Sequence, residues 1–589
     1  MYSKIKPPNS WVKSISNINE EDIHKLLFEN YKEGDIIFKI IKNDGSIKNL
    51  TKTNCILASE NLAFEIDHLA GSKAAFRQLK IMAVIGASEE SAILMLSSLF
   101  LNAHHCICFE DLSEEAISKR CEVFNPDILI CRKHLLEKIQ KASSKLVRKD
   151  IPILPINLNF NNSKLSKQPY RKLCNNYIYK TNSSLFTLFT SGTTGFPKAI
   201  VHGTQKYLNY AKYTTNHFFG IKKGSKIFTA VDAGWINGHT YSFYGPLLLG
   251  AISIINENPN LISIPRLLGN YLYTLKPDCF YTSVTLLRLL KSLIPSDKKL
   301  NDYAEGEILI NRIGSCGEPL AHEVGKWAIE FFRPTRKCIV NTYFQTETGG
   351  VLVAPRDEDN VPNNYSSVGK PNSELGMTIA KDIYSQSEIE EEGLDPNEIL
   401  ICKPWDGIFK EIISDKKSDY FTKAGFYRLH DVGYFDEEKN LFVGGRSDDV
   451  INVSGHRISS SEIESVSIAV ENVDEACAVA IPDQISGSKV ALYISSVNFN
   501  SKLHSEIELE IKNKILSQLS KYHLPKNIIY FKHLPKTKSG KIMRRLMREL
   551  NEESFHSTAN SDRDYSTLAN KENFLISKKE YLESINKTI

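Results

Sequence analysis

The sequence has no long hydrophobic run and no excess of charge of either sign. Its most apolar stretch, SAILMLSSLFLNA (91–103), is too short to span a bilayer and contains polar residues. The 73 basic and 69 acidic residues leave a formal net charge of +4 over 589 residues. This balance gives no reason to expect binding to nucleic acid or to a membrane surface, and we expect an ordinary globular protein.

The cysteines form no CxxC pair. There are 11 of them, scattered along the chain, which is typical of free thiols in a reducing compartment. The first residues, MYSKIKPPNSWVKS, contain neither a long apolar run nor a small-residue cleavage site, so we expect no signal peptide and a cytoplasmic location. In HHCICF (104–109) the histidines and cysteines would alternate between the two faces of a strand, which favours a buried strand over a metal site.

Strands and helices alternate in the first half of the chain, which predicts βαβ units and a parallel sheet. The predicted strands are LKIMAVIG (79–86), HHCICF (104–109), PDILIC (126–131) and SLFTLFT (184–190). The predicted helices are SEESAILMLSSLFLNA (88–103), SEEAISKRCEVF (113–124) and HGTQKYLNYAKYTTNHF (202–218). The segment between residues 190 and 202 would then join a strand to a helix.

The character of the sequence changes near residue 447. SSSEIESVSIAV (459–470) predicts a helix that begins with a capping box formed by Ser459 and Glu462. A strand, SKVALYISSV (488–497), and a helix, SEIELEIKNKILSQL (505–519), follow. We expect a small α+β unit here and, over residues 551–589, a polar flexible tail in which a short closing helix is an option.

The loop TSGTTGFPKAIVHG (190–203) nearly matches the Walker pattern for phosphate binding, but Pro197 and Ala199 break it. Its hydroxyls, glycines and lysine can offer hydrogen-bond donors and positive charge to a polyphosphate. The alternative is a surface loop that is merely rich in glycine and threonine. The residues concerned are Thr190, Ser191, Gly192, Thr193, Thr194, Gly195 and Lys198.

Together with this loop, four later segments, in the same order, resemble the adenylate-forming enzymes, the acyl-CoA synthetase superfamily. The sequences of these segments are most similar to those of acetyl-CoA synthetase and its short-chain relatives, and the resemblance runs from about residue 55 to 550. The segments are GSCGEP (314–319), NTYFQTETGG (341–350), GRSDDVINVSGHRISSSEIES (445–465) and LPKTKSGKIMRRLMREL (534–550).

The resemblance implies an α/β fold and a two-step reaction. A large N-terminal domain with βαβ-layered sheets (55–447) would follow an N-terminal segment (1–54) and precede a small mobile α+β C-terminal domain (448–550). A carboxylate would attack the α-phosphate of ATP with Mg²⁺, forming an acyl-adenylate and pyrophosphate, and the thiol of coenzyme A would then displace AMP. Because the first step brings two anions together, cations and hydrogen-bond donors must offset their repulsion.

By resemblance, three residues carry this chemistry. Lys541 would contact the carboxylate and the α-phosphate, Glu347 would hold Mg²⁺ through its carboxylate, and Arg446 would bind the ribose or the phosphates. The alternative for Lys541 is that it is one more lysine in a basic segment. Acetylation of Lys541 by an acetyltransferase, reversed by a deacetylase, would remove its charge, and mass spectrometry of the native protein tests that expectation.

The resemblance also implies a nucleotide-binding set. Tyr343 would stack on the adenine, Asn341 would bond the adenine edge and Asp431 would accept from the ribose hydroxyls, although the aromatic residues could equally be core. The sequence departs from the family where the usual Thr-Gly-Asp becomes Leu429-His430-Asp431. The full set is Thr190, Ser191, Gly192, Thr193, Thr194, Lys198, Gly317, Glu318, Pro319, Asn341, Thr342, Tyr343, Phe344, Gln345, Thr346, Asp431, Arg446 and Arg457.

The implied acyl pocket indicates a short acid. Phe344 stands where acetyl-CoA synthetases have tryptophan and longer-chain relatives have glycine, so an acid of roughly two to four carbons is favoured. Asn237 replaces a threonine and would bond either a polar group of the acid or a group of the protein. The pocket residues are Trp235, Ile236, Asn237, Cys316 and Phe344; Ser454 and Gly455 would line the coenzyme A tunnel, and Asp448 would be the hinge.

Two other functions fit the same residues. A ligase of this kind could load a separate acyl-carrier protein instead of coenzyme A. A nucleotide-binding protein without turnover is the other option, suggested by the Leu429-His430 departure.

Overall fold

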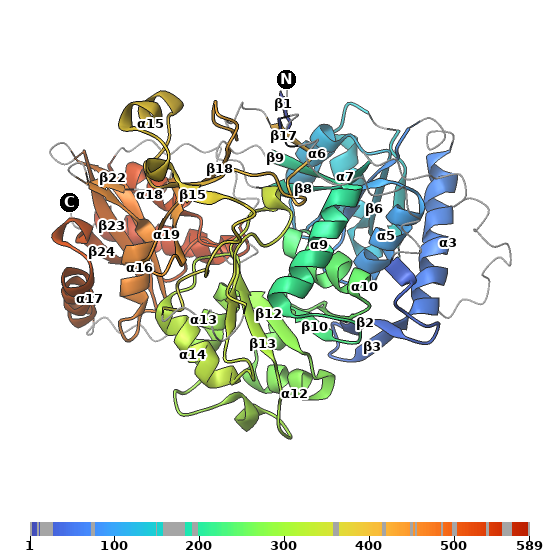
Figure 1. Ribbon diagram of the computed structural model, residues 1–589, viewed down its shortest axis with the longest axis horizontal. Helices are drawn as coiled ribbons and strands as arrows, with labels where there is room; N and C mark the ends of the chain where they lie inside the picture. Colours follow the sequence, from blue (N-terminus) through green and yellow to red (C-terminus); the bar gives the residue numbers. More distant parts are fainter. Residues whose placement is uncertain are drawn as a thin grey trace.

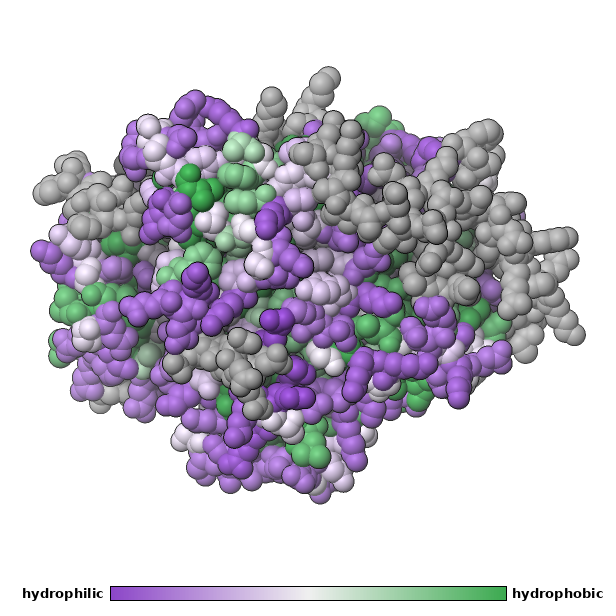
Figure 2. Space-filling model, in the orientation of Figure 1, coloured by the Kyte–Doolittle hydropathy of each residue, from purple (hydrophilic) through white to green (hydrophobic). Residues whose placement is uncertain are grey.

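The computed structural model describes residues 3–8, 11, 27–71, 77–148, 150–156, 183–190, 198–356, 364–414, 420–447, 451–453, 456–483, 487–496, 504–537, 541–555 and 568–586. Figure 1 shows the N-terminal part, in blue and green, at one side of the molecule and the C-terminal unit, in orange and red, at the opposite side. On the face shown in Figure 2, hydrophilic residues predominate and hydrophobic ones occur in scattered groups. Within the described ranges, no helix combines the length and the hydrophobicity needed to cross a bilayer.

The first sheet contains the predicted βαβ units. Strands β4, β5, β6, β7 and β8 pair in parallel, and the connecting helices are α5 (Glu89–Phe100), α6 (Glu114–Phe124) and α7 (Leu136–Ser144). The spatial order is β1 (Ser3–Ile5), β17 (Glu411–Ser414), β9 (Lys198–Gly203), β8 (Ser184–Thr190), β5 (His104–Cys108), β4 (Lys80–Val84), β6 (Ile128–Arg132) and β7 (Ile153–Ile156). The buried strand predicted for HHCICF is confirmed as β5.

The predicted strand-to-helix connection is wrong, because β8 is followed along the chain by a second strand, β9, and not directly by a helix. β9 pairs antiparallel with β8 on one side and with β17 on the other, and helix α9 (Thr204–Phe219) begins only after Gly203. The strand forms because the consecutive residues Ala199, Ile200 and Val201 point to opposite faces of the sheet in turn, and both faces are covered there, so all three are buried. Residues 191–197, at the tip of this hairpin, lie outside the described residues.

Two strands of the N-terminal segment belong to the second sheet, and β1 of the same segment belongs to the first. The order of the second sheet is β14 (Ile339–Asn341), β13 (Arg312–Cys316), β12 (Cys279–Ser283), β10 (Lys226–Thr229), β11 (Ile252–Asn256), β2 (Ile36–Ile41) and β3 (Ile47–Thr51). Helix α3 (Lys52–Ala70) follows β3 and packs on α5, which is buried along nearly its whole length. Other helices of this part are the π-helix η2 (Gly238–Tyr244), α10 (Gly245–Leu249), α11 (Pro259–Ile262), α12 (Pro265–Leu275), α13 (Val284–Leu293) and α14 (His322–Phe332).

A smaller antiparallel sheet leads to the C-terminal unit. It comprises β15 (Met377–Ile379), β16 (Glu398–Ile401), β18 (Tyr427–Phe435) and β19 (Leu441–Arg446), with α15 (Gln386–Glu392) beside it. The next strand along the chain, β20 (Ile451–Val453), already belongs to another sheet. Sheet membership thus changes across residues 447–450, close to the domain boundary expected from the sequence.

The C-terminal unit is a sheet with helices, as predicted. Its strands are β20, β21 (His456–Ile458), β22 (Glu475–Asp483), β23 (Gly487–Ser495) and β24 (Pro525–Tyr530), and its helices are α16 (Ser460–Ile468), α17 (His504–Gln518), α18 (Arg544–Phe555) and α19 (Lys571–Asn586). The predicted capping box is wrong, because the Ser459 hydroxyl donates to the Gly444 carbonyl instead of capping α16. The closing helix that was an option for the tail is confirmed as α19; it packs on the unit through Phe574, which is 1% exposed, so this described part is not a flexible tail.

Candidate active site

Two neighbouring parallel strands of the second sheet end at the centre of the candidate site. β13 and β14 pair with Ser315 opposite Asn341. Because the carboxyl ends of parallel strands meet at one edge of a sheet, residues 317–319 and residues 341–346 leave the sheet side by side. Gly317 has a φ of +93°, a backbone conformation that favours glycine and that lets the chain turn here.

The polar groups at these strand ends are already hydrogen-bonded. Asn341 Oδ1 accepts from the Ser315 hydroxyl at 3.1 Å, and its Nδ2 donates to the Ser367 carbonyl at 3.0 Å. The carboxylate of Glu318 pairs with Arg288. These contacts fix the two segments relative to the sheet, and the predicted roles of Asn341 and Glu318 beside the adenine stay predictions.

The Asp431 carboxylate has fixed partners from two segments. It lies opposite Arg446 in the β18–β19 pair, with Arg446 Nη1 3.6 Å from its Oδ1. Its Oδ2 accepts from the Tyr343 hydroxyl at 2.7 Å and from the Gln345 amide at 2.6 Å. Burial raises the pKa of the Asp431 carboxyl, while Arg446, the two hydrogen bonds and the ammonium of Lys541 act in the opposite direction. One carboxylate oxygen of Asp431 thus accepts two hydrogen bonds, and the other faces the Arg446 guanidinium.

A lysine of the first sheet reaches the Glu347 carboxylate. Lys198 begins β9, and its ammonium lies 3.9 Å from Glu347 Oε1 and donates to the Tyr420 hydroxyl at 2.9 Å. Burial first, and the charge of Glu347 second, raise the pKa of Tyr420, so the phenol stays protonated. Beside Lys198 in the hairpin register, Thr190 Oγ1 is buried and has no hydrogen-bond partner among the described residues.

The Glu347 carboxylate suits a magnesium ion. Mg²⁺ usually takes one or two carboxylates and completes its shell with water and phosphate oxygens. The Glu347 side chain is 12% exposed, so one carboxylate can be reached from outside. No group of three or more metal-ligating side chains occurs in the described part of the chain, so the other ligands of an ion held here would come from phosphate and water.

A buried histidine holds the short helix that carries Glu347. His202 Nε2 lies 2.8 Å from the carbonyl of Thr346, the first residue of η4 (Thr346–Thr348). Burial lowers the pKa of His202 to about 4, so the ring is neutral at pH 7, and Nε2 carries the proton because a carbonyl can only accept. The sequence reasoning missed both His202 and Tyr420. The alternation of β9 after Lys198 gives a weak signal for the histidine, whereas Tyr420 lies 222 residues from Lys198 with no motif around it.

Residues of the predicted acyl pocket meet on the other side of β13. Cys316 donates to the Thr282 carbonyl at 3.3 Å, and burial raises the pKa of its thiol to about 12, opposed by hydrogen bonds from Tyr281 and Asn237. The Phe344 ring packs edge-on against Tyr241 and joins the same hydrophobic cluster as Cys316. Asn237 thus contacts Cys316, and Phe344 packs against the cluster that contains Cys316; their role as an acyl pocket stays a prediction. Ile236 is buried in the neighbouring cluster, and Trp235 packs against Phe109, with ring centroids 5.1 Å apart.

A pair of buried imidazoles supports the segment before this pocket. His239 Nδ1 lies 3.3 Å from the Trp235 carbonyl, and its Nε2 lies 3.3 Å from His105 Nε2. Burial lowers the pKa of His239 to about 3 and keeps both rings neutral. Because the carbonyl requires a proton on Nδ1 of His239, His105 is the donor between the two rings. From the sequence we expected His105 only as a strand residue, and its pairing with His239 across 134 positions was not predictable locally.

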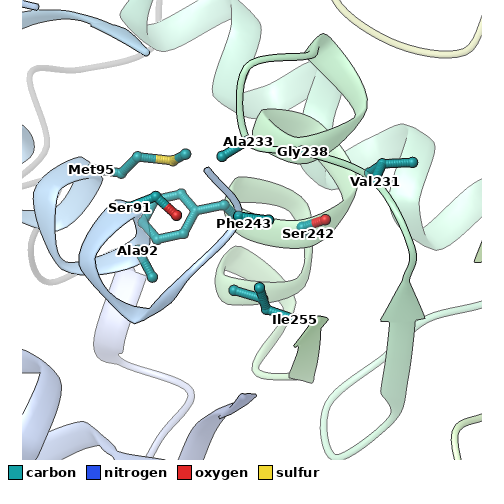
Figure 3. Close-up of a pocket in the computed structure, with 10 residues that line it drawn as sticks. Ser91, Ala92, Met95, Val231, Ala233, Gly238, Ser242, Phe243 and Ile255 are labelled. Atoms are coloured by element: carbon teal, nitrogen blue, oxygen red, sulfur yellow. The ribbon is translucent and has the colours of Figure 1, made fainter. Parts of the chain in front are cut away.

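The small cavity in Figure 3 lies between α5 and η2. Figure 3 shows Phe243 pointing toward Ser91 and Ala92 of α5, and Met95 lies on the same helix. The volume of the cavity is about 10 Å³, enough for about one water molecule. It is too small for an acyl group, so it leaves the position of the predicted pocket unchanged.

Lys541 is exposed and belongs to the C-terminal unit. Its ammonium lies near enough to Asp431 to act on the pKa of that carboxyl. Contacts between the units support this placement, because Ser461 Oγ donates to the Gly444 carbonyl at 2.6 Å and the charge of Glu318 acts on Glu464 of α16. The structure therefore gathers Lys541, Asp431 and Arg446 on one side of the site.

Several predicted residues cannot be placed. The residues of the hairpin tip, the hinge and the coenzyme A tunnel lie outside the described ranges: Ser191, Gly192, Thr193, Thr194, Asp448, Ser454 and Gly455. Of Arg457 only the backbone, in β21, is described. The roles of all these residues stay predictions.

The departure at residues 429–430 has a structural explanation. His430 stands where the family has glycine and keeps the left-handed backbone, with a φ of +54°. Its ring packs edge-on against Tyr420, with centroids 5.7 Å apart, and its Nδ1 lies 3.7 Å from Glu398 Oε1. These contacts offset the strain of the left-handed conformation, and Asp431 keeps its place beside Arg446.

Two family models match the chain. The model described as AMP-binding enzyme matches residues 73–398, and the model described as AMP-binding enzyme C-terminal domain matches residues 462–541. Acetyl-coenzyme A synthetase 2 of Candida albicans is 35% identical over 392 residues, covering 66% of this chain and 57% of that protein. Acetyl-coenzyme A synthetase of Campylobacter jejuni is 30% identical over 495 residues, covering 78% and 73%. The match thus spans only 57% of the length of the fungal relative.

Solved structures share the fold over nearly the whole chain. The anthranilate CoA ligase AuaEII in complex with anthranoyl-AMP superimposes with a TM-score of 0.72 at 18% identity, covering 89% of this chain and 96% of that one. ATP-bound MatB from Rhodopseudomonas palustris gives 0.70 at 16% identity, with 90% and 99% covered. These likenesses show the predicted fold, a large N-terminal domain followed by a smaller sheet domain.

Proposed function

The chain belongs to the AMP-binding enzyme family, and from this premise we propose that it is an ATP-dependent acid–thiol ligase. It activates a short-chain carboxylate as an acyl-adenylate with release of pyrophosphate, and then transfers the acyl group to coenzyme A with release of AMP. The observation that carries this proposal is the convergence of Asp431, Arg446, Glu347 and Lys198, from two sheets and the helix η4, with Lys541 from the C-terminal unit.

The nucleotide is held by groups that are already oriented. Asp431 Oδ1 accepts from a ribose hydroxyl, since Oδ2 is occupied by Tyr343 and Gln345 and cannot easily turn away. Arg446 lies beside the same oxygen and donates to the ribose or the α-phosphate. Because these partners are fixed before the nucleotide arrives, little reorganisation is needed at the moment of reaction.

Two ammonium groups offset the repulsion between the carboxylate substrate and the triphosphate. Lys198 and the buried Thr190 hydroxyl lie at the base of the 190–203 hairpin and bind the outgoing pyrophosphate. Lys541 reaches the α-phosphate and the acid. Glu347 would hold Mg²⁺, which when bound neutralises phosphate charge. After adenylation Lys541 has to leave so that the thiol can enter, which is the reason to propose Asp448 as a hinge and Ser454 and Gly455 as coenzyme A contacts.

The acid is short. Phe344 fills part of the space at the end of the site, and Asn237 acts on the Cys316 thiol, which supports the option that this amide serves the protein rather than a polar substrate group. One methylene in such a pocket is worth about 1–3 kcal/mol, so neighbouring chain lengths are discriminated only modestly.

Carboxylate-dependent ATP–pyrophosphate exchange across straight-chain acids of two to eight carbons tests the function and the substrate together. We expect the fastest exchange with acids of two to four carbons. Phe344→Gly should move the optimum to longer acids by about tenfold in relative rate, while Leu575→Gly on the far helix α19 should not. Adding coenzyme A or a phosphopantetheinylated carrier protein then shows which thiol is acylated. Absence of exchange with every acid would refute the ligase proposal.

A further inference from the structure

The end of the chain returns to the segment that carries Lys541. Residues 568–570 run alongside residues 534–537, with Leu568 paired to Thr537 as an isolated β-bridge. The Ala569 amide donates to the Lys536 carbonyl at 2.9 Å. This pairing adds a short third strand to a hairpin that would otherwise stand at the edge of the C-terminal unit.

The Asn570 side chain makes two further bonds to the same segment. Its Oδ1 accepts from the Lys536 amide at 3.0 Å, and its Nδ2 donates to the Leu534 carbonyl at 2.7 Å. A carboxamide is suited to this position because it offers one acceptor and one donor to backbone groups two residues apart. An aspartate could make only the first of these bonds.

The braced segment is connected directly to the backbone of Lys541. The Thr537 amide donates to the Lys541 carbonyl at 2.8 Å, and Lys536 pairs with Ile542 across the hairpin. The Met543 amide closes the base by donating to the Pro535 carbonyl at 2.8 Å. The backbone of Lys541 therefore follows the position of residues 534–537. Residues 538–540, between the two arms, lie outside the described part.

Helix α19 anchors the brace in the core of the C-terminal unit. Asn570 immediately precedes the helix, and its carbonyl accepts from the Phe574 amide at 2.9 Å. Phe531 of the unit contacts two rings of the helix: its ring centroid lies 5.9 Å from that of Phe574 and 6.0 Å from that of Tyr581. The helix is thus held by apolar contacts with the sheet, while its Asn570 end holds the hairpin.

Building on the proposed function, we propose that Asn570 is a positioning residue for adenylation: it fixes the hairpin that presents Lys541 to the nucleotide. The contacts fall on the backbone just before Lys541 and not on the sheet, so their loss changes where the ammonium is delivered more than whether the unit folds. A side chain displaced by about 1 Å from its working position costs about a hundredfold in rate.

The substitution Asn570→Asp tests this directly in the full-length chain. It keeps the acceptor for the Lys536 amide and remains a good residue at a helix start, but it removes the donor to Leu534. We expect carboxylate-dependent exchange, which needs Lys541, to fall at least tenfold, with transfer from a supplied acyl-adenylate to coenzyme A within about twofold of wild type. Asn573→Asp, the same chemical change three residues later on an exposed position of α19, is the matched control and should leave both rates unchanged.

Hydrogen exchange of the Thr537 and Met543 amides gives a readout that does not depend on activity. Both should be protected in the wild type and should exchange at least tenfold faster in Asn570→Asp, even if no acid supports pyrophosphate exchange at all. The inference is overturned if Asn570→Asp leaves adenylation and amide protection intact, or if it slows both half-reactions equally. It is also overturned if these amides are unprotected in the folded wild-type protein.

Discussion

On the large unit, Asp431 and Glu347 are held by partners from other strands, whereas Lys541 on the C-terminal unit is exposed and its position is set through its backbone alone. The first arrangement gives electrostatics that are in place before the substrate binds. The second allows one charge to arrive for one step and to leave for the next. We therefore expect substitutions in the two regions to have different effects. Those around Asp431 and Glu347 should impair both half-reactions and stability, whereas those at Lys541 should impair adenylation alone.

The largest expected effect comes from Lys541→Ala. Carboxylate-dependent exchange should fall about 10²–10³-fold, because a charge aimed at the transferring group is lost. Transfer from a supplied acyl-adenylate should remain within about threefold of wild type, and the thermal midpoint should not change, because substitutions of exposed side chains usually alter stability by less than ~0.5 kcal/mol. Equal losses in the two assays would contradict the separation of roles.

Asp431→Ala should instead impair everything at once. It leaves the Tyr343 hydroxyl without an acceptor and the Gln345 amide with the Leu429 carbonyl alone, which should lower the free energy of unfolding by about 1–3 kcal/mol and slow both half-reactions. Asp431→Asn is the matched control: it keeps one acceptor oxygen for Tyr343 and Gln345 and removes the desolvated charge, so it should lose activity with little loss of stability. If the alanine variant kept full stability, the fixed-partner description of this region would be wrong.

Acid should destabilise the large unit through its buried imidazoles. The pKa of His202 is lowered to about 4 from its ordinary 6.5, so its contribution is complete above pH 6.5 and is lost as the pH falls toward 4. At pH 5 this one ring should account for about 2 kcal/mol of lost unfolding free energy. All four tryptophans, Trp11, Trp235, Trp327 and Trp405, precede residue 447, so their fluorescence during denaturation reports on this unit.

His202→Gln, which keeps a donor for the Thr346 carbonyl, is the variant to compare in that experiment. The difference in stability between the two proteins should shrink as the pH is lowered from 7.5 to 5. A difference that is the same at both pH values would show that His202 is not a neutral buried ring.

The smallest expected effect belongs to His430→Gly. Glycine removes the strain of a φ of +54° but loses the ring contact with Tyr420, so the two changes should nearly cancel and stability should stay within about 1 kcal/mol. Nucleotide affinity, measured by calorimetry, should change by less than about threefold. A loss of nucleotide affinity above tenfold would mean that the His430 ring itself takes part in binding. His430 would then belong with Asp431 and Glu347 to the groups that are in place before the substrate binds.

The strands and helices of the first half were predictable from the sequence because hydrophobic periodicity is a local property. β9 was not, because a six-residue strand after a glycine-rich loop gains its stability from β17, more than 200 residues further on. α19 was not recognised as a packed helix for a similar reason: its composition is polar, and a few rings such as Phe574 and Tyr581 attach it to the sheet. The motifs gave Asp431 and Glu347, but not Tyr420, His202 or Asn570, whose contacts are made at a distance.

The sequence by itself determined the kinds of groups available and their order along the chain: a hydroxyl- and glycine-rich loop ending in a lysine, carboxylates at residues 347 and 431, and a lysine near residue 541. Only the tertiary structure decided which atoms meet, as when Tyr343 reaches Asp431 across 88 positions and the last helix braces the hairpin of Lys541. The physical reason is that strand pairing and burial join segments that are remote in sequence, so the partner of a side chain is set by the packing of whole sheets and not by its neighbours in the chain.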